Sequence, residues 1–185
     1  MEYRLLGQTG VRVSSLCMGS VTFGREADEE AAAAMFHRCR EVGINFFDTA
    51  NVYADGRAEE ILGRLIADCR AEIVLTSKVG FPTGKGVNAR GLSRRHIMQS
   101  VEGSLRRLGT DRLDLYFVHT FDSHTPMEET LRALDDLVHQ GKILYPGVSN
   151  WATWQIATAL GISAREGLAR FACIQPMYSL VKRQA

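Results

Sequence analysis

This sequence lacks the features that would place it in a membrane or a secreted class. It has no run of about 18 apolar residues, which a membrane-spanning helix needs, and no apolar segment near its N-terminus of the kind a secretory signal contains. Its four cysteines form no CxxC pair, a pattern that favours a reducing compartment. We therefore expect a cytoplasmic protein that is neither exported nor inserted in a membrane.

The sequence also lacks an excess of charge of one sign. Its 22 Lys and Arg residues against 21 Asp and Glu residues give a formal net charge of +1. Proteins that bind the phosphate backbone of nucleic acids normally carry a basic excess, so we expect no nucleic-acid partner. One local basic group stands out, formed by Arg90, Arg94, Arg95, Arg106 and Arg107, and such charge runs are usually a solvated face.

What the sequence does contain is a repeated series of short β-branched or aromatic runs. They occupy residues 13–18, 44–47, 73–76, 113–118, 143–148 and 171–174. Their spacing of about 30 residues is the length of one strand plus a crossover helix, so we predict an α/β fold with a parallel sheet. Residues 3–6 and 11–13, joined by the turn-like segment 7–10, predict a β-hairpin ahead of the repeat. No linker divides the chain, so we expect a single domain over residues 1–185.

Helical patterns fill the intervals between these runs, and one of them has a clear start signal. Thr125, Pro126 and Glu128 have the spacing of a capping box with proline at the first helical position. One residue conflicts with the pattern of strands. Pro146 lies inside a predicted central strand, where a proline removes a hydrogen bond of the ladder.

Polar or small residues close every predicted strand. In α/β folds the ligand sits outside the carboxyl ends of the strands, so these residues are expected on one rim. In chain order they are Gly19 and Ser20, Asp48, Lys78, His119, Ser149 and Asn150, and Gln175. Six strand ends in one register predict a functional site there.

This rim combines an acid, a base and an imidazole, and Tyr53 follows Asp48 closely enough to reach it. A neighbouring ammonium favours the phenolate form of a tyrosine, which makes the tyrosine useful as a proton donor near neutrality. Lys78 is placed to be that ammonium, and Asp48 is placed to orient it. His119 would offer a hydrogen bond to a substrate oxygen.

Other chemistries fit the sequence less well. The segment 19–24 lacks the middle glycine of a GxGxxG fingerprint, so a Rossmann site is not supported. The segment 80–86 is one residue short of a P-loop and has Gly86 where Ser or Thr must bind magnesium, so we interpret it as a flexible loop. His119 and His124 flank Asp122 without the spacing of a zinc site, and we expect no bound metal.

Several longer motifs make the chain resemble the aldo-keto reductase family. They are Leu6-Gly7-Gln8-Thr9-Gly10, Phe46-Phe47-Asp48-Thr49-Ala50 with Tyr53, Glu59-Glu60-Ile61-Leu62-Gly63, Thr76-Ser77-Lys78, Leu113-Asp114-Leu115-Tyr116 with His119, Gly141-Lys142-Ile143 and Gly147-Val148-Ser149-Asn150. The motifs occur in the family's order over nearly the whole chain. Such an ordered set is far more specific than any one of them.

The resemblance implies a (β/α)8 barrel of the TIM type that binds NADPH without a Rossmann domain and reduces aldehydes or ketones. The family's catalytic tetrad falls on Asp48, Tyr53, Lys78 and His119. Tyr53 would protonate the carbonyl oxygen while a hydride reaches the carbonyl carbon. The cofactor-binding residues would be Asp48, Ser149, Asn150 and Gln175, the last three at the nicotinamide carboxamide.

The chain is short for that fold. Eight units need about 250 residues and six need roughly 190, close to the 185 present. We therefore expect about six of the eight βα units, with the domain incomplete at its C-terminus. A fragment, a truncated gene product, or a homo-oligomer that completes the sheet across subunits would each explain this length, and we favour one of the first two.

Two alternatives to a reductase remain open from the residues. A barrel lysine such as Lys78 can form a Schiff base, as in a class I aldolase. The chain could instead keep the fold, and even the cofactor site, as a non-catalytic sensing or scaffold protein. The sequence does not identify the carbonyl substrate, and NADPH rather than NADH is implied only by the family.

Overall fold

The computed structural model describes residues 1–181 and 183, and strands and helices alternate along most of this length. The strands are β1 (Tyr3–Leu5), β2 (Arg12–Ser14), β3 (Met18–Gly19), β4 (Phe46–Asp48), β5 (Val74–Val79), β6 (Leu113–Val118), β7 (Ile143–Ser149) and β8 (Cys173–Gln175). The helices are α1 (Glu29–Glu41), α2 (Arg57–Ile66), α3 (Arg94–Leu108), α4 (Met127–His139) and α5 (Thr153–Glu166), with short turns η1 (Tyr53–Gly56) and η2 (Arg70–Glu72). None of the helices in this described part is both long and apolar enough to cross a membrane.

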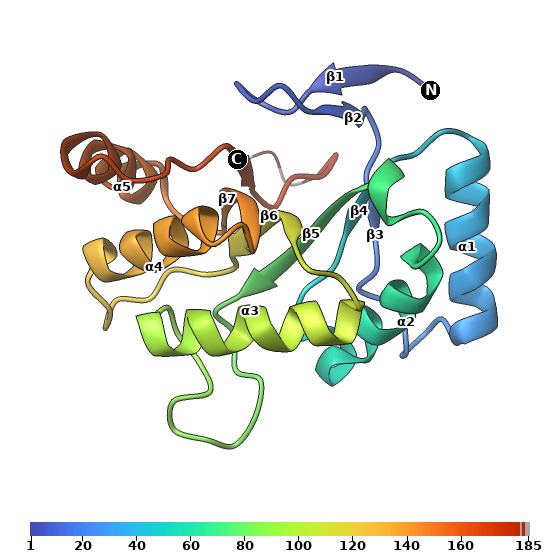
Figure 1. Cartoon of the computed structure of the whole chain (residues 1–185), viewed down its shortest axis with the longest axis horizontal. Helices are drawn as coiled ribbons and strands as arrows, with labels where there is room; N and C mark the ends of the chain where they lie inside the picture. The colour runs from blue at the N-terminus through green and yellow to red at the C-terminus, as the bar shows by residue number, and fades with distance from the viewer. Residues whose placement is uncertain (182, 184–185) are drawn as a thin grey trace.

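Strands β3 to β8 form one parallel sheet in chain order. The five helices lie around the outside of the curled sheet, and the β1–β2 hairpin is set apart above it (Figure 1). The prediction of six parallel strands, crossover helices and an N-terminal hairpin is therefore confirmed. The architecture corresponds to part of a (β/α)8 barrel.

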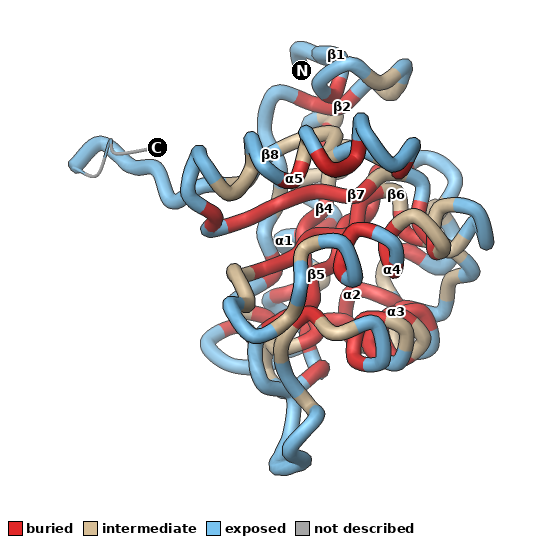
Figure 2. Tube along the Cα trace, turned by 90° about the vertical axis from the view of Figure 1, so that its left-hand side faces the viewer, coloured by how far each residue is buried: buried red, intermediate tan, exposed pale blue. Residues whose placement is uncertain are grey.

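The apolar core is divided between the two faces of the sheet. A large cluster packs the outward-facing side chains of the strands against the five helices. A smaller cluster lies on the inner face, where Leu6 and Val13 of the hairpin region pack on Val74, Leu115 and Phe117. Buried residues follow the strands and the sheet-facing sides of the helices, whereas the hairpin and the C-terminal segment are mostly exposed (Figure 2). The hairpin thus covers one end of the inner face and leaves the carboxyl ends of the strands free.

The predicted first strand, residues 13–18, is wrong as a single element. Val13 pairs with Arg4 inside the hairpin, and the parallel sheet begins only at Met18. Between these two strands, the N–H of Ser14 donates to the side-chain oxygen of Asn45, just before β4, at 2.7 Å. A continuous apolar run does not distinguish one strand from two short strands that belong to different sheets.

The predicted capping box before α4 is also wrong. The N-cap is Pro126, which makes no side-chain cap bond, and the hydroxyl of Thr125 donates instead to Asp122 at 2.7 Å. Asp122 accepts the backbone N–H groups of Leu92 and His124 as well. The Thr125 hydroxyl, which the sequence pattern predicted to cap α4, therefore binds the Asp122 carboxylate instead.

Pro146 is accommodated inside β7 without breaking the strand. Its carbonyl accepts the N–H of Ala172 at 2.9 Å, so its polar groups face the side of β8. In parallel pairing the missing N–H would point toward Arg170, which precedes the first residue of β8. The missing N–H of Pro146 therefore falls just before the paired part of β7 and β8, which begins at Gly147 and Cys173.

We predict that Gly63→Ala destabilises the fold. A Cβ at Gly63 would stand 2.6 Å from the carbonyl oxygen of Arg107 and 2.7 Å from the Cα of Leu108, so α2 and α3 would have to separate. The expected loss is about 1–3 kcal/mol in the free energy of unfolding, measured by urea denaturation. Gly161→Ala in α5 is the matched control, since its Cβ would meet nothing within 4 Å and should add about 0.5–1 kcal/mol. A Gly63→Ala protein as stable as the parent would contradict this account of the helix contact.

Candidate active site

The centre of the site is the ammonium group of Lys78, whose side chain is 1% exposed. Its Nζ donates to Asp48 Oδ2 at 2.5 Å, to the carbonyl oxygen of Thr49 at 2.9 Å and to Tyr53 Oη at 3.2 Å. An ammonium has three N–H donors, and each has an acceptor here. The buried charge is thus fully hydrogen-bonded and directly opposed by a carboxylate.

Neighbouring strands hold the carboxylate of Asp48 in place. Asp48 ends β4 and pairs in register with Thr76 of β5, whose hydroxyl donates to Asp48 Oδ1 at 2.6 Å. Both carboxylate oxygens are therefore occupied, one by Lys78 and one by Thr76. Because Thr76 and Lys78 are two residues apart on β5, they face the same side of the sheet.

Tyr53 reaches Lys78 from an unusual turn. The two residues after it, Ala54 and Asp55, have φ angles of 47° and 54°, and Gly56 has a φ of 94°. Left-handed conformations in successive non-glycine residues are costly and persist only where surrounding contacts impose them. Tyr53 Oη lies within hydrogen-bonding distance of the ammonium because the chain reverses sharply here before α2 begins at Arg57.

His119 lies beside Tyr53 just after the end of β6. Their rings meet edge to face at a centroid distance of 5.9 Å, and the Phe81 ring meets His119 in the same way at 4.6 Å. Burial, and secondarily the charge of Lys78, lower the pKa of His119 from 6.5 to about 4. The imidazole is therefore neutral near pH 7. Its Nδ1 is buried and has no hydrogen-bond partner within the described chain.

Ser149, Asn150 and Gln175 form a second group at the ends of β7 and β8. The Ser149 hydroxyl donates to the carbonyl of Gln175 at 2.8 Å, and Asn150, with a φ of 58°, donates from Nδ2 to the carbonyl of His119 at 2.8 Å. The Asn150 bond ties this group to the Lys78 group. Among the described residues, neither the side-chain amide of Gln175 nor the side-chain oxygen of Asn150 has a hydrogen-bond partner. Both groups can therefore bind a ligand.

A second buried ionic cluster lies behind β5, on the face opposite Lys78. Glu59, which is fully buried, accepts Ser77 Oγ at 2.5 Å and Arg107 Nε at 2.6 Å. Ser77 precedes Lys78 and so faces the helices, while Lys78 faces the inside of the sheet. The cluster fixes the position of β5 against α2 and α3.

The structure brings together the residues that the rim pattern selected. Asp48, Tyr53, Lys78 and His119 meet in one group, and Ser149, Asn150 and Gln175 meet in the group next to it. Sequence reasoning missed Thr76, Phe81 and Glu59. Thr76 could have been found, because it stands two residues before Lys78 and so shares its face; nothing in the sequence signals the long-range contacts of the other two.

The thiol of Cys173, near the site, is poorly suited to nucleophilic chemistry. Burial raises the pKa of Cys173 to about 11, with the charge of Asp48 adding to the effect. All four cysteines are free. At neutral pH Cys173 is a thiol rather than a thiolate, so proton transfer by the tyrosine is the chemistry that this arrangement best supports.

Comparison with known proteins agrees with this arrangement. The profile of the aldo/keto reductase family matches residues 15–185. A protein of Oryza sativa subsp. japonica described as a probable voltage-gated potassium channel subunit beta is 43% identical over 187 residues, and one of Arabidopsis thaliana with the same description is 42% identical. Each alignment covers 99% of this chain and 57% of the relative, so the chain spans little more than half the length of these proteins.

We predict that His119 makes the stability of the fold sensitive to acid. The folded pKa of His119 lies near 4 and its ordinary value is 6.5, so the unfolded chain binds more protons between these values. The stability associated with neutral His119 is complete above about pH 6.5 and declines as the pH falls toward 4. Urea denaturation at a series of pH values measures this slope.

His119→Gln should flatten that slope, and His37→Gln, at an exposed position in α1, should leave it unchanged. Burial lowers the pKa of His96 too, so part of the slope will remain in both variants. Equal slopes in the parent and in His119→Gln would contradict the prediction.

Proposed function

Since the chain belongs to the aldo/keto reductase family, we propose that it carries the catalytic centre for NADPH-dependent reduction of an aldehyde or ketone to an alcohol. The observation that carries the proposal is the buried Lys78 ammonium bonded at once to Asp48 and to the Tyr53 hydroxyl. This arrangement supplies a polarised proton donor at a rim where a carbonyl group can approach.

Tyr53 is the proposed general acid. Bound NADPH supplies the hydride that the carbonyl carbon accepts. Tyr53 Oη gives its proton to the carbonyl oxygen, which yields the alcohol and leaves a phenolate that is reprotonated from solvent. Lys78, 3.2 Å from Oη, stabilises the phenolate charge, and Asp48 holds Lys78 charged and oriented.

His119 is proposed to orient the carbonyl rather than to protonate it. With a pKa near 4 it carries no proton to give at neutral pH, but a neutral imidazole can donate one N–H to the substrate oxygen. Edge-on contacts with Tyr53 and Phe81 fix the plane of the ring. Both donors would then converge on the same oxygen, as transition-state stabilisation requires.

The residues at the ends of β7 and β8 fit the carboxamide of a nicotinamide. A carboxamide needs acceptors for its NH₂ group and donors for its oxygen. The free Asn150 oxygen and the Gln175 amide provide both kinds, and the Ser149 hydroxyl lies beside them. The bond from Asn150 to the carbonyl of His119 would keep the cofactor ring aligned with the proton donors.

The same contacts argue against an aldolase. A Schiff base requires an uncharged lysine amine with open space around it. Lys78 is buried, opposed by a carboxylate and bonded through all three N–H groups. The proposed reductase mechanism uses Lys78 charged and in these contacts. An aldolase mechanism would require Lys78 to lose its proton and its hydrogen bonds to Asp48, Thr49 and Tyr53.

A second candidate function is that of a channel subunit. Two relatives that are 42–43% identical are described as probable voltage-gated potassium channel beta subunits. The chain, or the protein it belongs to, could therefore bind a potassium channel and use its cofactor site for sensing rather than turnover. NADPH binding without reduction of a broad panel of carbonyl compounds would favour this candidate.

We predict that Tyr53→Phe lowers kcat for carbonyl reduction about 10²- to 10⁴-fold, since the general acid is lost while the ring is kept. The Kd for NADPH should stay within about twofold of the parent value, because the hydroxyl acts on the carbonyl oxygen in the chemical step and does not bind the cofactor. Steady-state kinetics and fluorescence titration measure the two quantities. Tyr3→Phe, at an exposed position in β1, is the matched control and should leave kcat unchanged. An undiminished kcat in Tyr53→Phe would refute the proposed role.

We also predict that Gln175→Ala weakens NADPH binding about tenfold, by removing a direct hydrogen bond to the carboxamide. The side chain of Gln175 has no partner within the described residues, so the fold should tolerate the change. Gln140→Ala, at an exposed position after α4, should bind NADPH like the parent. Identical affinities for Gln175→Ala and Gln140→Ala would exclude Gln175 from the cofactor site.

A further inference from the structure

Thr76 places a hydroxyl group between the apolar inner face of the sheet and the charge of Lys78. It is fully buried in β5, two residues after Val74 and two before Lys78, so the three side chains share one face. Its register partner on β6, Leu115, belongs with Val74 to the inner apolar cluster. A buried hydroxyl costs free energy unless it is hydrogen-bonded, so valine would suit this position better if packing were its only role.

The Thr76 hydroxyl is bonded to the Asp48 carboxylate, and this bond decides which oxygen remains for Lys78. Thr76 Oγ1 donates to Asp48 Oδ1 at 2.6 Å, and Lys78 Nζ donates to Asp48 Oδ2 at 2.5 Å. Within the described part of the chain the carboxylate accepts from no other group. The register of β4 and β5 sets Thr76 opposite Asp48, so the pairing of the strands provides this contact. Each carboxylate oxygen therefore has one donor.

The number of N–H groups on Lys78 makes this division of the carboxylate important. Its three N–H groups are shared among Asp48 Oδ2, the Thr49 carbonyl and Tyr53 Oη, and the contact with Tyr53 is the longest of the three, at 3.2 Å. A buried carboxylate oxygen without a donor is costly, so an Oδ1 that lost the Thr76 hydroxyl would turn toward the ammonium. The two Asp48 oxygens and the Thr49 carbonyl would then use all three N–H groups. None would be left for Tyr53.

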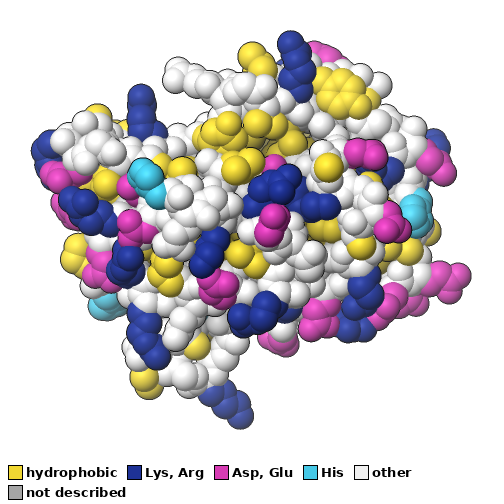
Figure 3. Space-filling view, in the orientation of Figure 1, with side chains coloured by type: hydrophobic (Ala, Val, Ile, Leu, Met, Phe, Trp, Pro, Cys, Tyr) yellow, Lys and Arg dark blue, Asp and Glu magenta, His cyan; other side chains and the backbone are white. Residues whose placement is uncertain are grey.

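Burial increases the effect of exchanging one hydrogen bond for another at this point. On the face of the molecule shown in Figure 3, basic and acidic side chains are interspersed at the surface, where water and salt screen their charges. The side chains of Lys78 and Asp48 are only 1% and 10% exposed, so hydrogen bonds within the protein replace most of their hydration. Solvent therefore compensates poorly for a hydrogen bond that is lost here.

We propose that Thr76 is a positioning residue, whose hydroxyl holds the Asp48 carboxylate so that one N–H group of Lys78 stays directed at the Tyr53 hydroxyl. Thr76 influences the reaction only through Asp48 and Lys78. The geometric part of the proposal is independent of the reaction, whereas its effect on turnover rests on the proposed reductase function. The two parts are therefore tested by separate measurements.

Proton-detected ¹⁵N NMR of the lysine ammonium group tests the geometry without any substrate. Lys78 is the one buried lysine among the described residues, so its ammonium protons should exchange with water slowly enough to be observed. In the parent, Tyr53→Phe should shift the Lys78 signal, because it removes a hydrogen-bond partner. In a Thr76→Val background the same change should leave the signal in place, because the contact with Tyr53 is already lost. Thr130→Val is the matched control background, since it removes an equally buried hydroxyl that donates to the carbonyl of Leu92, and the shift should persist there.

Steady-state kinetics of carbonyl reduction test the effect on turnover. Thr76→Val should lower kcat about tenfold, as expected for a lost hydrogen bond to a charged group, while KM stays within about twofold. Thr76→Ser keeps the hydroxyl and should keep most of the activity, whereas Thr76→Ala should lose as much as Thr76→Val. A role in packing alone predicts the opposite order, with the valine variant unaffected and the serine and alanine variants impaired alike. Thr130→Val should leave kcat and KM unchanged.

Three results would overturn the proposal. The first is a parent protein without a slowly exchanging Lys78 signal, and the second is a shift by Tyr53→Phe that is as large in the Thr76→Val background as in the parent. The third is an active parent in which Thr76→Val keeps the parental kcat or Thr76→Ser is as impaired as Thr76→Ala. Circular dichroism establishes that each variant is folded, and the serine and alanine variants supply the comparison if Thr76→Val does not fold. A parent that reduces no carbonyl compound would count against the proposed function, while the NMR measurement alone would still decide the role of Thr76.

Discussion

The buried ammonium of Lys78 is the constraint on which the site depends. Removing a charge from water is expensive, and a buried charge is tolerated only when it is paired and hydrogen-bonded. Lys78 meets this requirement through Asp48 at the end of β4, the carbonyl of Thr49 and the Tyr53 hydroxyl. The need to satisfy one charge thus brings a strand end and a strained turn to a single point, which is where the proposed chemistry takes place.

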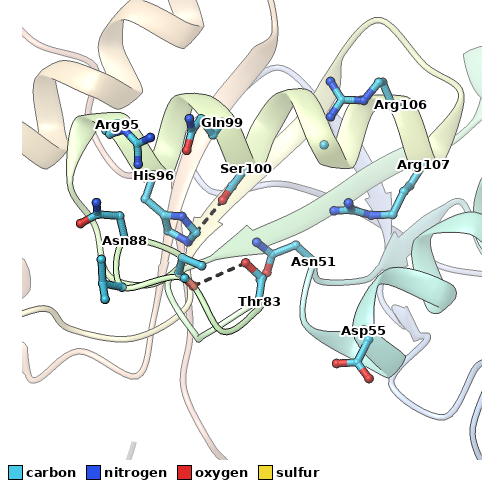
Figure 4. Close-up of a pocket in the computed structure, with 14 residues that line it drawn as sticks. Asn51, Asp55, Thr83, Asn88, Arg95, His96, Gln99, Ser100, Arg106 and Arg107 are labelled. Atoms are coloured by element: carbon cyan, nitrogen blue, oxygen red, sulfur yellow. Dashed lines mark hydrogen bonds between the residues drawn. The ribbon is translucent and has the colours of Figure 1, made fainter.

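The strand that carries Lys78 is held by ionic contacts on both faces. Inside the curled sheet Lys78 is paired with Asp48, and outside it Ser77 binds Glu59, which is paired with Arg107. Loss of one member of either cluster would leave an uncompensated buried charge, so each cluster resists displacement of the strand. Arg107 also lines an outer cavity, which is bordered by α3, residues 51–55 and the loop 83–89 (Figure 4).

The proposed division of labour follows the order of strands in the sheet. The ends of β4 to β6 and the turn η1 carry the proposed proton-transfer residues, and the ends of β7 and β8 carry the candidate carboxamide contacts. The bond from Asn150 to the carbonyl of His119 joins the two parts across the β6–β7 boundary. A rigid parallel sheet suits this function because strand register fixes the spacing of side chains along the rim. Proton donor and cofactor ring then need little further adjustment.

The sequence by itself determined the α/β repeat and the rim that collects Asp48, Lys78 and His119, because strand spacing and alternation are local properties of the chain. It also indicated the family through motifs in a fixed order. Only the tertiary structure decided that residues 13–18 belong to two sheets and that Thr125 binds Asp122 rather than capping a helix. The left-handed turn after Tyr53, the pairing of Glu59 with Arg107 and the outer cavity were likewise invisible in the sequence. Each depends on contacts between segments far apart in the chain, and such contacts leave no periodic signal.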